Sequence, residues 1–282
     1  MSELTPPASN EFRPNYLRVW KTFLRNSLVR EMTFRGNFLI EVVTRAFWFS
    51  AQVLLFHIIY SRVGVIQDWS QYEYFGFMAT GMLINALVEA LFMPNAAEFS
   101  ELIRSGNLDF VLLKPIDTQF LVSCQRVDLS DISQMLMAGG LLWYSVSNAG
   151  VDVTAGRVAM YLLLVLTGVA FFYGLMVALA STSVWLGRNQ GLYDFWFYIT
   201  MFARYPAGVY RQGAIGEVLW WSLSFVIPIL LVVTVPSRVL LGKVLDPNWW
   251  VALVCPVLTL LLLWVSRRIF VWSLEHYRSA SS

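Results

Sequence analysis

The sequence predicts an all-α integral membrane protein with six transmembrane helices, preceded by an amphipathic helix at the membrane surface. Two observations predict this fold class. Of the 282 residues, 57% are hydrophobic and 13% are charged, whereas soluble domains contain about 45 to 50% and about 25%. The apolar residues also gather in separate runs, several of them near the roughly 20 residues that cross a bilayer as a helix. A single soluble core would not cover so many runs.

Residues 1–37 are expected to lie on the cytoplasmic side of the membrane. The first fourteen residues are polar, contain proline and lack the basic start and apolar stretch of a secretory signal. Residues 16–33 predict an amphipathic helix, because an apolar stripe runs beside a basic one. Such a helix lies on the inner membrane surface. The two stripes are Leu17, Trp20, Leu24 and Leu28, and Arg18, Lys21 and Arg25.

Six apolar segments make up the predicted membrane domain, residues 38–272, and residues 273–282 form a cytoplasmic tail. Tryptophans such as Trp69, Trp143 and Trp249 lie near the ends of these segments, as in the aromatic belts of membrane proteins. The expected cores of the spans are 46–66, 74–93, 132–148, 158–186, 192–210 and 249–269.

Another apolar stretch, within 212–247, is expected to enter the membrane from outside and return before the last span. Pro228 divides it into halves that are too short to cross a bilayer. With six spans, both termini are cytoplasmic and most Lys and Arg residues next to the spans lie inside. A seventh span would place the C-terminus outside. This alternative changes the charge distribution only slightly, so it stays open.

No catalytic, metal or cofactor site is predicted for the chain itself. The motifs GxxxxGK[ST], HExxH, CxxC and GxSxG are absent from the sequence. His57 and His276 fall in distant parts of the predicted topology. Cys124 and Cys255 are expected to be small hydrophobic residues within or beside the spans. The net charge of +2 is too small to indicate a nucleic-acid partner.

The segment 94–115, between the second and third spans, predicts a short amphipathic helix in the cytoplasm. Asn95 is expected to cap this helix together with Glu98, and Gly106 to end it. Two surfaces suit such a helix, the lipid headgroups or a groove on a cytoplasmic partner. Its apolar face consists of Phe99, Leu102 and Ile103, and its polar surface of Glu98, Glu101 and Arg104.

Three strings resemble the ABC-2 type permeases, and the resemblance extends over almost the whole chain. IRSGNLDFVLLKP at 103–115 is similar to the cytoplasmic motif of that family. RYPAGVY at 204–210 and FVIPILLVVTVPSRVLLGK at 225–243 are similar to the fifth span and outer re-entrant segment of one bacterial branch. Ser237 and Arg238 depart from the smaller, more apolar residues expected after Pro236, which leaves the geometry of an outer gate open.

The resemblance implies a multi-pass protein of the bacterial plasma membrane that pairs with a second copy or a related permease. Separate ATPase subunits, which bind ATP and magnesium, would dock on the cytoplasmic helices, and the usual direction of transport would be export. The resemblance favours the partner groove over lipid for the helix 95–105, with Phe99, Leu102 and Ile103 as its anchor. The residues expected by this resemblance to couple the ATPase to the spans are Glu98, Phe99, Glu101, Leu102, Ile103, Arg104, Leu108, Asp109, Lys114 and Pro115.

Four polar residues within the spans are candidates for the transport path. Asn85 and Glu89 lie in the second span, and Asp194 and Arg204 in the fifth. These two spans line the subunit interface in the family that the chain resembles. Polar residues in spans often mark a transport route, but mutual pairing across helices is an equally open interpretation.

Charges nearer to the span ends have local explanations. Glu41 and Arg45 have the favourable order for an ion pair four residues apart on a helix. Arg126, Asp128 and Asp131 are expected at the inner end of the third span, in contact with water or another subunit.

The leading interpretation is a permease subunit of an ATP-driven ABC exporter, which forms the path for an amphipathic or polymeric substrate as a dimer. The alternative is a secondary transporter driven by an ion gradient, with Glu89 and Asp194 as coupling acids. A membrane scaffold without transport activity is a third possibility. An associated ATPase with a phosphate loop would separate these three.

Overall fold

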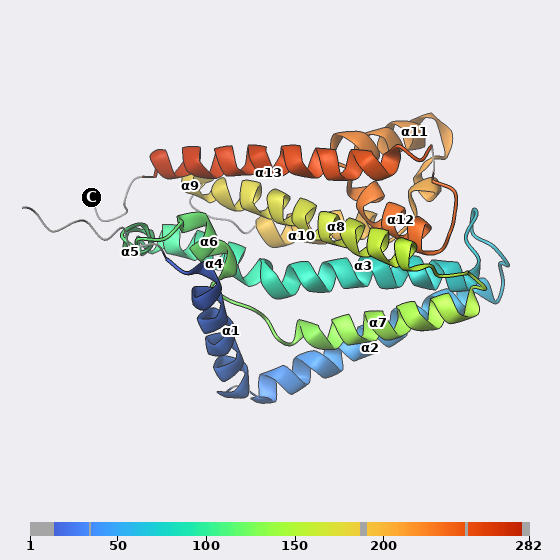
Figure 1. Ribbon diagram of the computed structural model, residues 1–282, viewed down its shortest axis with the longest axis horizontal. Helices are drawn as coiled ribbons and strands as arrows, with labels where there is room; N and C mark the ends of the chain where they lie inside the picture. The colour runs from blue at the N-terminus through green and yellow to red at the C-terminus, as the bar shows by residue number, and fades with distance from the viewer. Residues whose placement is uncertain (1–13, 34, 187–190, 246–247, 278–282) are drawn as a thin grey trace, which may run out of the picture.

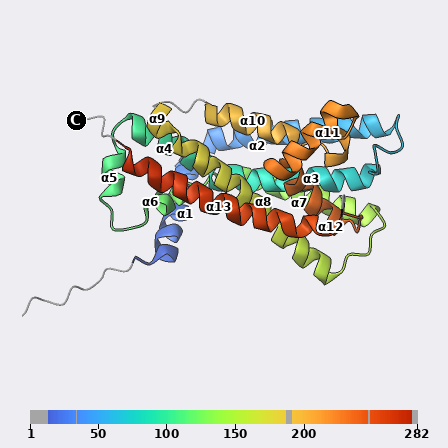
Figure 2. The same ribbon diagram turned by 90° about the horizontal axis from the view of Figure 1, so that it is seen from above.

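The computed structural model describes residues 14–33, 35–186, 191–245 and 248–277, and every regular element in these ranges is a helix. Figure 1 shows an elongated bundle of long helices, and Figure 2 shows the same bundle from above. The all-α class expected from the sequence is confirmed. The bundle is built from α2 (Arg35–Tyr60), α3 (Gln71–Leu91), α7 (Asp131–Asn148), α8 (Ala155–Ser181) and α13 (Val251–Glu275).

Four segments in the described residues are long and apolar enough to cross a membrane. A bent helix pair near residue 227 would make a fifth if it were one span. The chain is therefore a multi-pass membrane protein. The four segments are Gly36–Tyr60, Gln71–Arg104, Ala155–Trp185 and Val251–Glu275.

The predicted first and fifth spans differ from the helices that form. The first helix ends at Tyr60, and the following loop closes with backbone hydrogen bonds between Ile66 and Trp69. The fifth, α10 (Gly191–Phe202), has 12 residues and is followed by a turn and the short 3-10 helix η1 (Ala207–Tyr210). Pro206 explains this end, because proline disfavours helical geometry in the residue before it and lacks a backbone donor.

Small residues bring α3 and α8 close to their neighbours. A Cβ atom on Gly168 of α8 would lie 2.8 Å from Cγ1 of Val232, and one on Gly76 of α3 would lie 2.5 Å from Oγ of Ser145. In lipid, helices gain stability from such close packing rather than from hydrophobic burial. The segment that contains α3 is thereby the most buried of the four long apolar segments, with Ile84 and Val88 fully buried.

The segment before the last span forms a V. Its arms are α11 (Gly213–Trp221) with the π-helical turn η2 (Ser222–Val226), and α12 (Ile229–Leu240), which meet at Pro228 with a bend of 80°. Figure 1 shows both arms opening toward the same end of the bundle.

Contacts with one loop support this orientation of the V. Gly208, before the first arm, lies near the side chain of Gln67, and Arg238, in the second arm, forms an ion pair with Asp68 at 2.8 Å. Lys243, after the second arm, pairs with Glu73 at 3.0 Å. Both ends of the V thus meet the α2–α3 connection, which favours the re-entrant arrangement over a seventh span.

The opposite end of the bundle carries α1 and the short helices. Figure 1 shows α1 (Tyr16–Thr33) running across the bundle axis, where the last described residues also lie. The connections between α3 and α7 lie farther along the bundle axis than α1. The short helices at this end are α4 (Met93–Arg104), α5 (Leu108–Leu112), α6 (Thr118–Cys124) and α9 (Ser183–Leu186).

Candidate functional site

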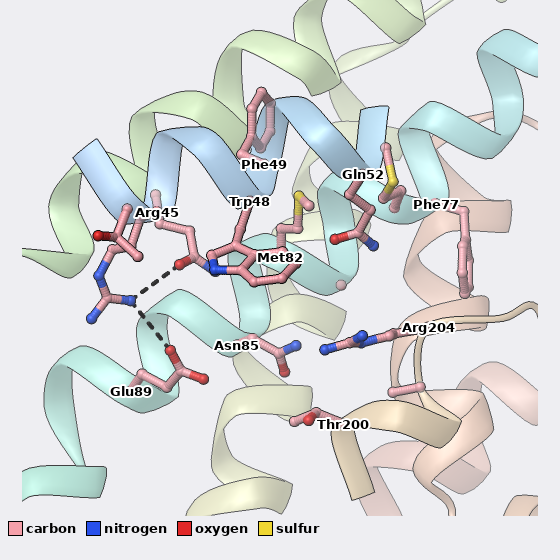
Figure 3. A pocket seen from close by; sticks show the side chains of 15 residues that line it. Arg45, Trp48, Phe49, Gln52, Phe77, Met82, Asn85, Glu89, Thr200 and Arg204 are labelled. Carbon is pink, nitrogen blue, oxygen red and sulfur yellow. Dashed lines mark hydrogen bonds and ion pairs between the residues drawn. The ribbon is translucent and has the colours of Figure 1, made fainter. Parts of the chain in front are cut away.

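A groove runs between α2, α3 and α10. Its central cavity has a volume of about 280 Å³ and opens toward the surface beside α2 (Figure 3). The polar and aromatic side chains around this cavity come from helices far apart in the sequence. They include Arg45, Trp48 and Gln52 of α2, Asn85 and Glu89 of α3, Gln134 of α7, Thr200 of α10, and Arg204.

Two neighbouring cavities extend the groove toward both ends of the bundle. One, of about 390 Å³, shares Arg45 and Glu89 with the central cavity. The other, of about 310 Å³, shares Trp48 and Arg204 with it. Because the cavities have common walls, they form one groove, called here the α2 groove, from the start of α7 to the end of α10.

The inner end of the α2 groove is held by paired charges. Arg45 forms ion pairs with Asp131 and, at 3.5 Å, with Glu89, and it donates a hydrogen bond to Oε1 of Gln134 at 3.2 Å. Trp196 of α10 donates from Nε1 to Glu89 at 3.0 Å. The Asp131 side chain is 1% exposed, so Arg45 compensates an acid that water hardly reaches. These contacts join α2, α3, α7 and α10.

Three of the four predicted path residues line the groove, and the fourth does not. Glu89 lies at the paired inner end, and Asn85 and Arg204 lie farther along the central cavity. Asp194, in the first turn of α10, is exposed and lines none of the three cavities. Glu89 pairs with residues of other helices, as one of the two interpretations expects. The Arg204 side chain has no such partner among the described residues.

The expected cap of the cytoplasmic helix is wrong. The helix α4 begins at Met93 with Pro94 in its first turn, a favoured position for proline, so Asn95 lies inside the helix. The side-chain amide of Asn95 instead forms hydrogen bonds with backbone groups, including those of Arg126, which is distant in the sequence. Its Nδ2 donates to the carbonyl of Arg126 at 2.6 Å and to that of Leu91 at 2.8 Å, and its Oδ1 accepts from the Arg126 amide at 2.7 Å.

The apolar face of α4 packs inside this chain. Phe99 is 1% exposed, and its ring lies 5.5 Å from that of Phe270 in α13, between centroids. Ile103 is also buried, and Leu102 is partly buried against the same core. The expectation that Phe99 and Ile103 insert into a groove of a partner is therefore wrong. The ends of α8 and α13 cover this face, which helical periodicity alone does not reveal.

The outward surface of this region comes from other residues. Glu101 and Arg104 form an exposed ion pair at 2.6 Å on α4. On α5, Leu108 is buried and anchors the helix, whereas Phe110 is 69% exposed and the adjoining Leu113 is 81% exposed. Lys114 and Pro115 follow in exposed positions, and Asp109 is partly buried. Sequence reasoning missed Phe110 and Leu113, because they are the two ends of a continuous apolar run, residues 110–113, that shows no amphipathic pattern.

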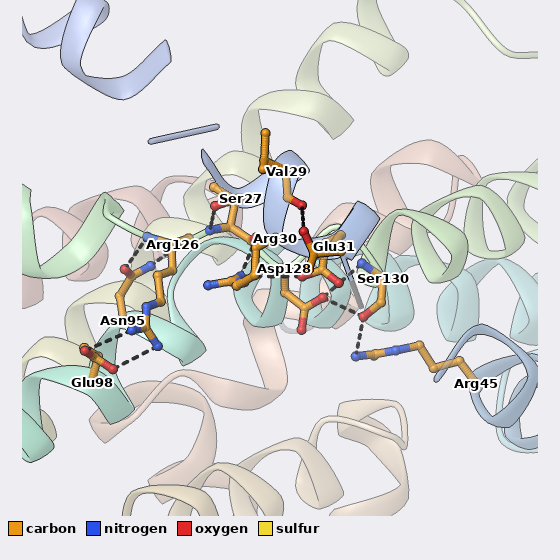
Figure 4. Close-up of polar contacts among 12 residues, drawn as sticks. Ser27, Val29, Arg30, Glu31, Arg45, Asn95, Glu98, Arg126, Asp128 and Ser130 are labelled. Carbon is orange, nitrogen blue, oxygen red and sulfur yellow. Dashed lines mark hydrogen bonds and ion pairs between the residues drawn. The ribbon is translucent and has the colours of Figure 1, made fainter. Parts of the chain in front are cut away.

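The segment 125–130 connects α4 to the groove (Figure 4). Arg126 forms an ion pair with Glu98 of α4 at 2.9 Å. The amide of Asp128 donates to the carbonyl of Ala90 at 2.8 Å, and the Asp128 carboxylate accepts from the hydroxyl of Ser130 at 2.6 Å. Arg45 then donates to Oγ of Ser130 at 3.4 Å. Side chains thus bind the start of the segment to α4 and its end to the α2 groove, and the backbone of residues 126–130 connects the two sets of contacts.

Helix α1 is attached to the same segment. The buried Ser27 hydroxyl accepts from the amide of Val127 at 3.0 Å, and Arg30 donates to the Val127 carbonyl at 3.4 Å. Burial and the nearby Asp128 carboxylate raise the pKa of Glu31, although Arg30 opposes the shift. The 125–130 segment is therefore the point where α1, α4 and the groove meet.

A second link joins the connection between α3 and α7 to the last helix. Asp117 caps α6 by accepting from the amide of Phe120 at 2.9 Å, and it pairs with Arg267 of α13 at 2.7 Å. Burial raises the pKa of Asp117, but the hydrogen bonds from Arg267 and Phe120 outweigh burial and hold it below the usual range. The carboxylate therefore stays ionised and keeps α6 against α13.

The described part of the chain contains no group of three or more His, Cys, Asp or Glu side chains placed to hold a metal ion. Cys255 is buried, as expected, and Cys124 is partly buried.

A family model described as "ABC-2 family transporter protein" matches residues 46–281, which include the 125–130 segment, the V and the lining of the α2 groove apart from Thr44 and Arg45. The chain belongs to the ABC-2 transporter family. No curated protein and no solved structure matches the sequence. The resemblance of the chain to ABC-2 permeases is thus confirmed, and this ABC-2 family protein is a multi-pass membrane component of a transport system.

Proposed function

We propose that this protein is the permease subunit of an ATP-driven ABC exporter, working as a dimer with separate ATPase subunits that bind ATP and magnesium. The family supports the class of transporter. The observation that carries the coupling is the route along the backbone of the 125–130 segment, which is bound to Asn95 and Glu98 of α4 at Arg126 and to Arg45 of the α2 groove at Ser130. A displacement of α4 would act on the groove through this route.

The exposed tip of α5 is the proposed docking surface for the ATPase. Phe110 and Leu113 are large apolar side chains with most of their surface uncovered. In Figures 1 and 2, α5 lies farther along the bundle axis than α1. If α1 marks the inner membrane surface, lipid does not reach α5, and a protein partner is the remaining cover for these side chains. Glu101 and Arg104 would orient the partner at the rim.

The proposed topology has six spans in a bacterial plasma membrane. In addition to the four long segments, α7 and the segment 191–210, which consists of α10, the following turn and η1, would cross. The cytoplasmic side is the end that carries α1, α4 and α5. The V would then be a re-entrant element at the outer side. Its two ends at the α2–α3 connection support this arrangement.

A transporter driven by an ion gradient has less support. Of its two expected coupling acids, Asp194 lies away from the groove, and Glu89 is engaged by Arg45 and Trp196. A coupling acid must gain and lose an ion during the cycle. An acid fixed by a cation and an indole donor is better suited to structure than to repeated ion exchange.

The test is co-purification of the tagged chain with an ATPase subunit from its native membrane. Phe110→Asp combined with Leu113→Asp should remove the ATPase, whereas Phe110→Leu, which keeps an apolar side chain, should retain it. An unchanged yield of ATPase in the double variant would exclude the tip of α5 as the docking surface. Transport into vesicles that runs on a gradient without nucleotide would overturn the ATP-driven mechanism itself.

A further inference from the structure

The outer half of the α2 groove differs from its inner end in how its polar groups are satisfied. At the inner end, Arg45 and Glu89 have partners from several helices. In the outer half, the Gln52, Asn85 and Arg204 side chains border the same cavity, and none has a hydrogen-bond partner among the described residues. Oδ1 of Asn85 is buried without a partner. Buried polar atoms are normally paired, and the half-buried Gln52 and the exposed Arg204 are also available, so this part of the groove has unused capacity to bind a ligand.

The Arg204 side chain extends into the groove rather than toward the outer surface. Its backbone carbonyl accepts a hydrogen bond from Tyr74, in the first turn of α3, at 3.4 Å. Figure 3 shows the guanidinium extending from there toward Asn85, with Gln52 on the neighbouring helix. A long cationic side chain close to a span end usually reaches toward water. The inward direction of Arg204 places its positive charge in the groove, on the side of Asn85.

The chemistry of the groove specifies the charge of a ligand. Glu89, the acid that borders the same cavity, is already bound by Arg45 and Trp196. Arg204, which follows the end of α10 and is exposed, is thus a cation of this cavity without an acid partner among the described residues. A cation left unpaired within a membrane domain typically marks a binding or transport site. A guanidinium binds phosphate or carboxylate through two parallel hydrogen bonds, and the two amide side chains can supply further donors. The ligand head is therefore anionic.

The cavity of about 310 Å³ at the Arg204 end of the groove indicates that the ligand also has an apolar part. Trp48, Leu55 and Phe56 of α2 line it beside Arg204, together with Tyr205. Trp48 and Leu55 are also more than half exposed at the surface of the protein. A polar head at Arg204 would thus adjoin an apolar surface that continues to the lipid-facing side of the protein.

We infer that Arg204, Asn85 and Gln52 form a headgroup site for an anionic amphiphile, with its apolar chain along Trp48 and Leu55. The inference rests on the proposed function insofar as it treats the α2 groove as the transport path. The same chemistry is present in a phosphate-bearing membrane lipid and in an amphiphilic substrate, and the experiment below separates these two sources.

The first measurement is binding of dodecyl phosphate to the purified full-length chain in neutral detergent, counted by native mass spectrometry. Arg204→Gln should weaken binding roughly tenfold or more, because it removes a charge-assisted hydrogen-bonded pair. Arg204→Lys should retain part of the affinity. Arg62→Gln is the matched control, since Arg62 is an exposed cation in the α2–α3 loop, outside the groove.

Equal affinity in Arg204→Gln and the unmodified protein, with Arg204→Gln folded, would overturn the site. If Arg204→Gln does not fold, Asn85→Ala replaces it, with a several-fold loss expected and no loss counting against the inference. This binding result is independent of any ATPase. Failure of the site and failure of the proposed ATP-driven function are thus distinguishable.

The second measurement identifies the source of the ligand in the complex with its ATPase. Dodecyl phosphate that stimulates ATP hydrolysis in the unmodified complex, but not with Arg204→Gln, would identify a transported substrate. A phospholipid that co-purifies with the unmodified chain, is lost in Arg204→Gln and is displaced by dodecyl phosphate without stimulation would identify a resident lipid. Either outcome supports the headgroup site.

Discussion

The side chain of Asn95 holds the backbone of Arg126 from both sides, with its Oδ1 accepting from the Arg126 amide and its Nδ2 donating to the Arg126 carbonyl. This pair of bonds fixes the 125–130 segment to α4 independently of the ion pair between Arg126 and Glu98. The connection between the cytoplasmic helix and the groove is therefore made at the level of the backbone.

Replacing Asn95 with alanine should destabilise the protein and weaken coupling together. Loss of its buried hydrogen bonds should cost about 1 to 3 kcal/mol, because the Arg126 backbone groups are left without partners. We expect a lower melting temperature in detergent and fewer substrate molecules moved per ATP. Asn148→Ala is the control, since Asn148 is exposed and donates only to the local carbonyl of Tyr144. Normal coupling in Asn95→Ala would contradict a role for this connection.

The ion pair of Arg45 with Asp131 should show strong mutual dependence. Arg45→Met alone leaves a buried carboxylate uncompensated, and the cost of breaking such a pair is about 3 to 5 kcal/mol. Asp131→Asn should lower the cost of the Arg45 substitution, so the double variant should be more stable than the sum of the single effects predicts. Melting temperatures of the four proteins provide the cycle. Additive effects would show that the pair contributes no coupling energy.

Phe99 should behave as a core residue and Phe110 as a surface residue. Phe99→Ala should cost about 3 to 5 kcal/mol, because a large buried ring is removed from between α4 and α13. Phe110→Ala should leave the melting temperature nearly unchanged. Thermal unfolding of the two variants without the ATPase separates stability from docking. A stable Phe99→Ala that fails to bind the ATPase would reverse the two roles.

Labelling of single cysteines should place the two ends of the bundle on opposite sides of the membrane. After Cys124 and Cys255 are replaced with serine, cysteine at Ser105 should react only from the cytoplasm. Cysteines at Val65 and Val244, which are both exposed, should react from outside. Labelling of Val65 and Val244 from opposite sides would mean that the V crosses the membrane.

The contact between Asp117 and Arg267 should weaken in acid. The pKa of Asp117 is lowered in the folded protein, so its contribution to stability is present above the ordinary aspartate pKa of about 3.9 and is lost as the pH falls through the lowered value. The pair is partly exposed, and its contribution should be about 1 kcal/mol or less. The difference in melting temperature between the unmodified protein and Asp117→Asn should therefore shrink below about pH 4. A constant difference would exclude this ionisation as its cause.

The sequence predicted the helical class, the family and three residues of the groove, because these depend on composition, strings and polar residues within apolar runs. It did not predict the partners of Arg45. Helical spacing offered Glu41, whereas the bundle brings Asp131 and Glu89 to Arg45. It also assigned Phe99 to a partner, because periodicity defines an apolar face without identifying what covers that face. Asp194 was grouped with the path because sequence does not show which side of α10 faces the groove.

The close contact of Gly168 with Val232 has a mechanical consequence. With less than the room for a methyl group between them, α8 and α12 interlock and cannot slide past one another without unpacking. Helix α2, in contrast, is hardly buried along its apolar length. A cycle that widens and narrows the groove would thus leave the helices around α8 in place and move α2 relative to them. The ion pairs of Arg45 would hold the two parts together when the groove is narrow.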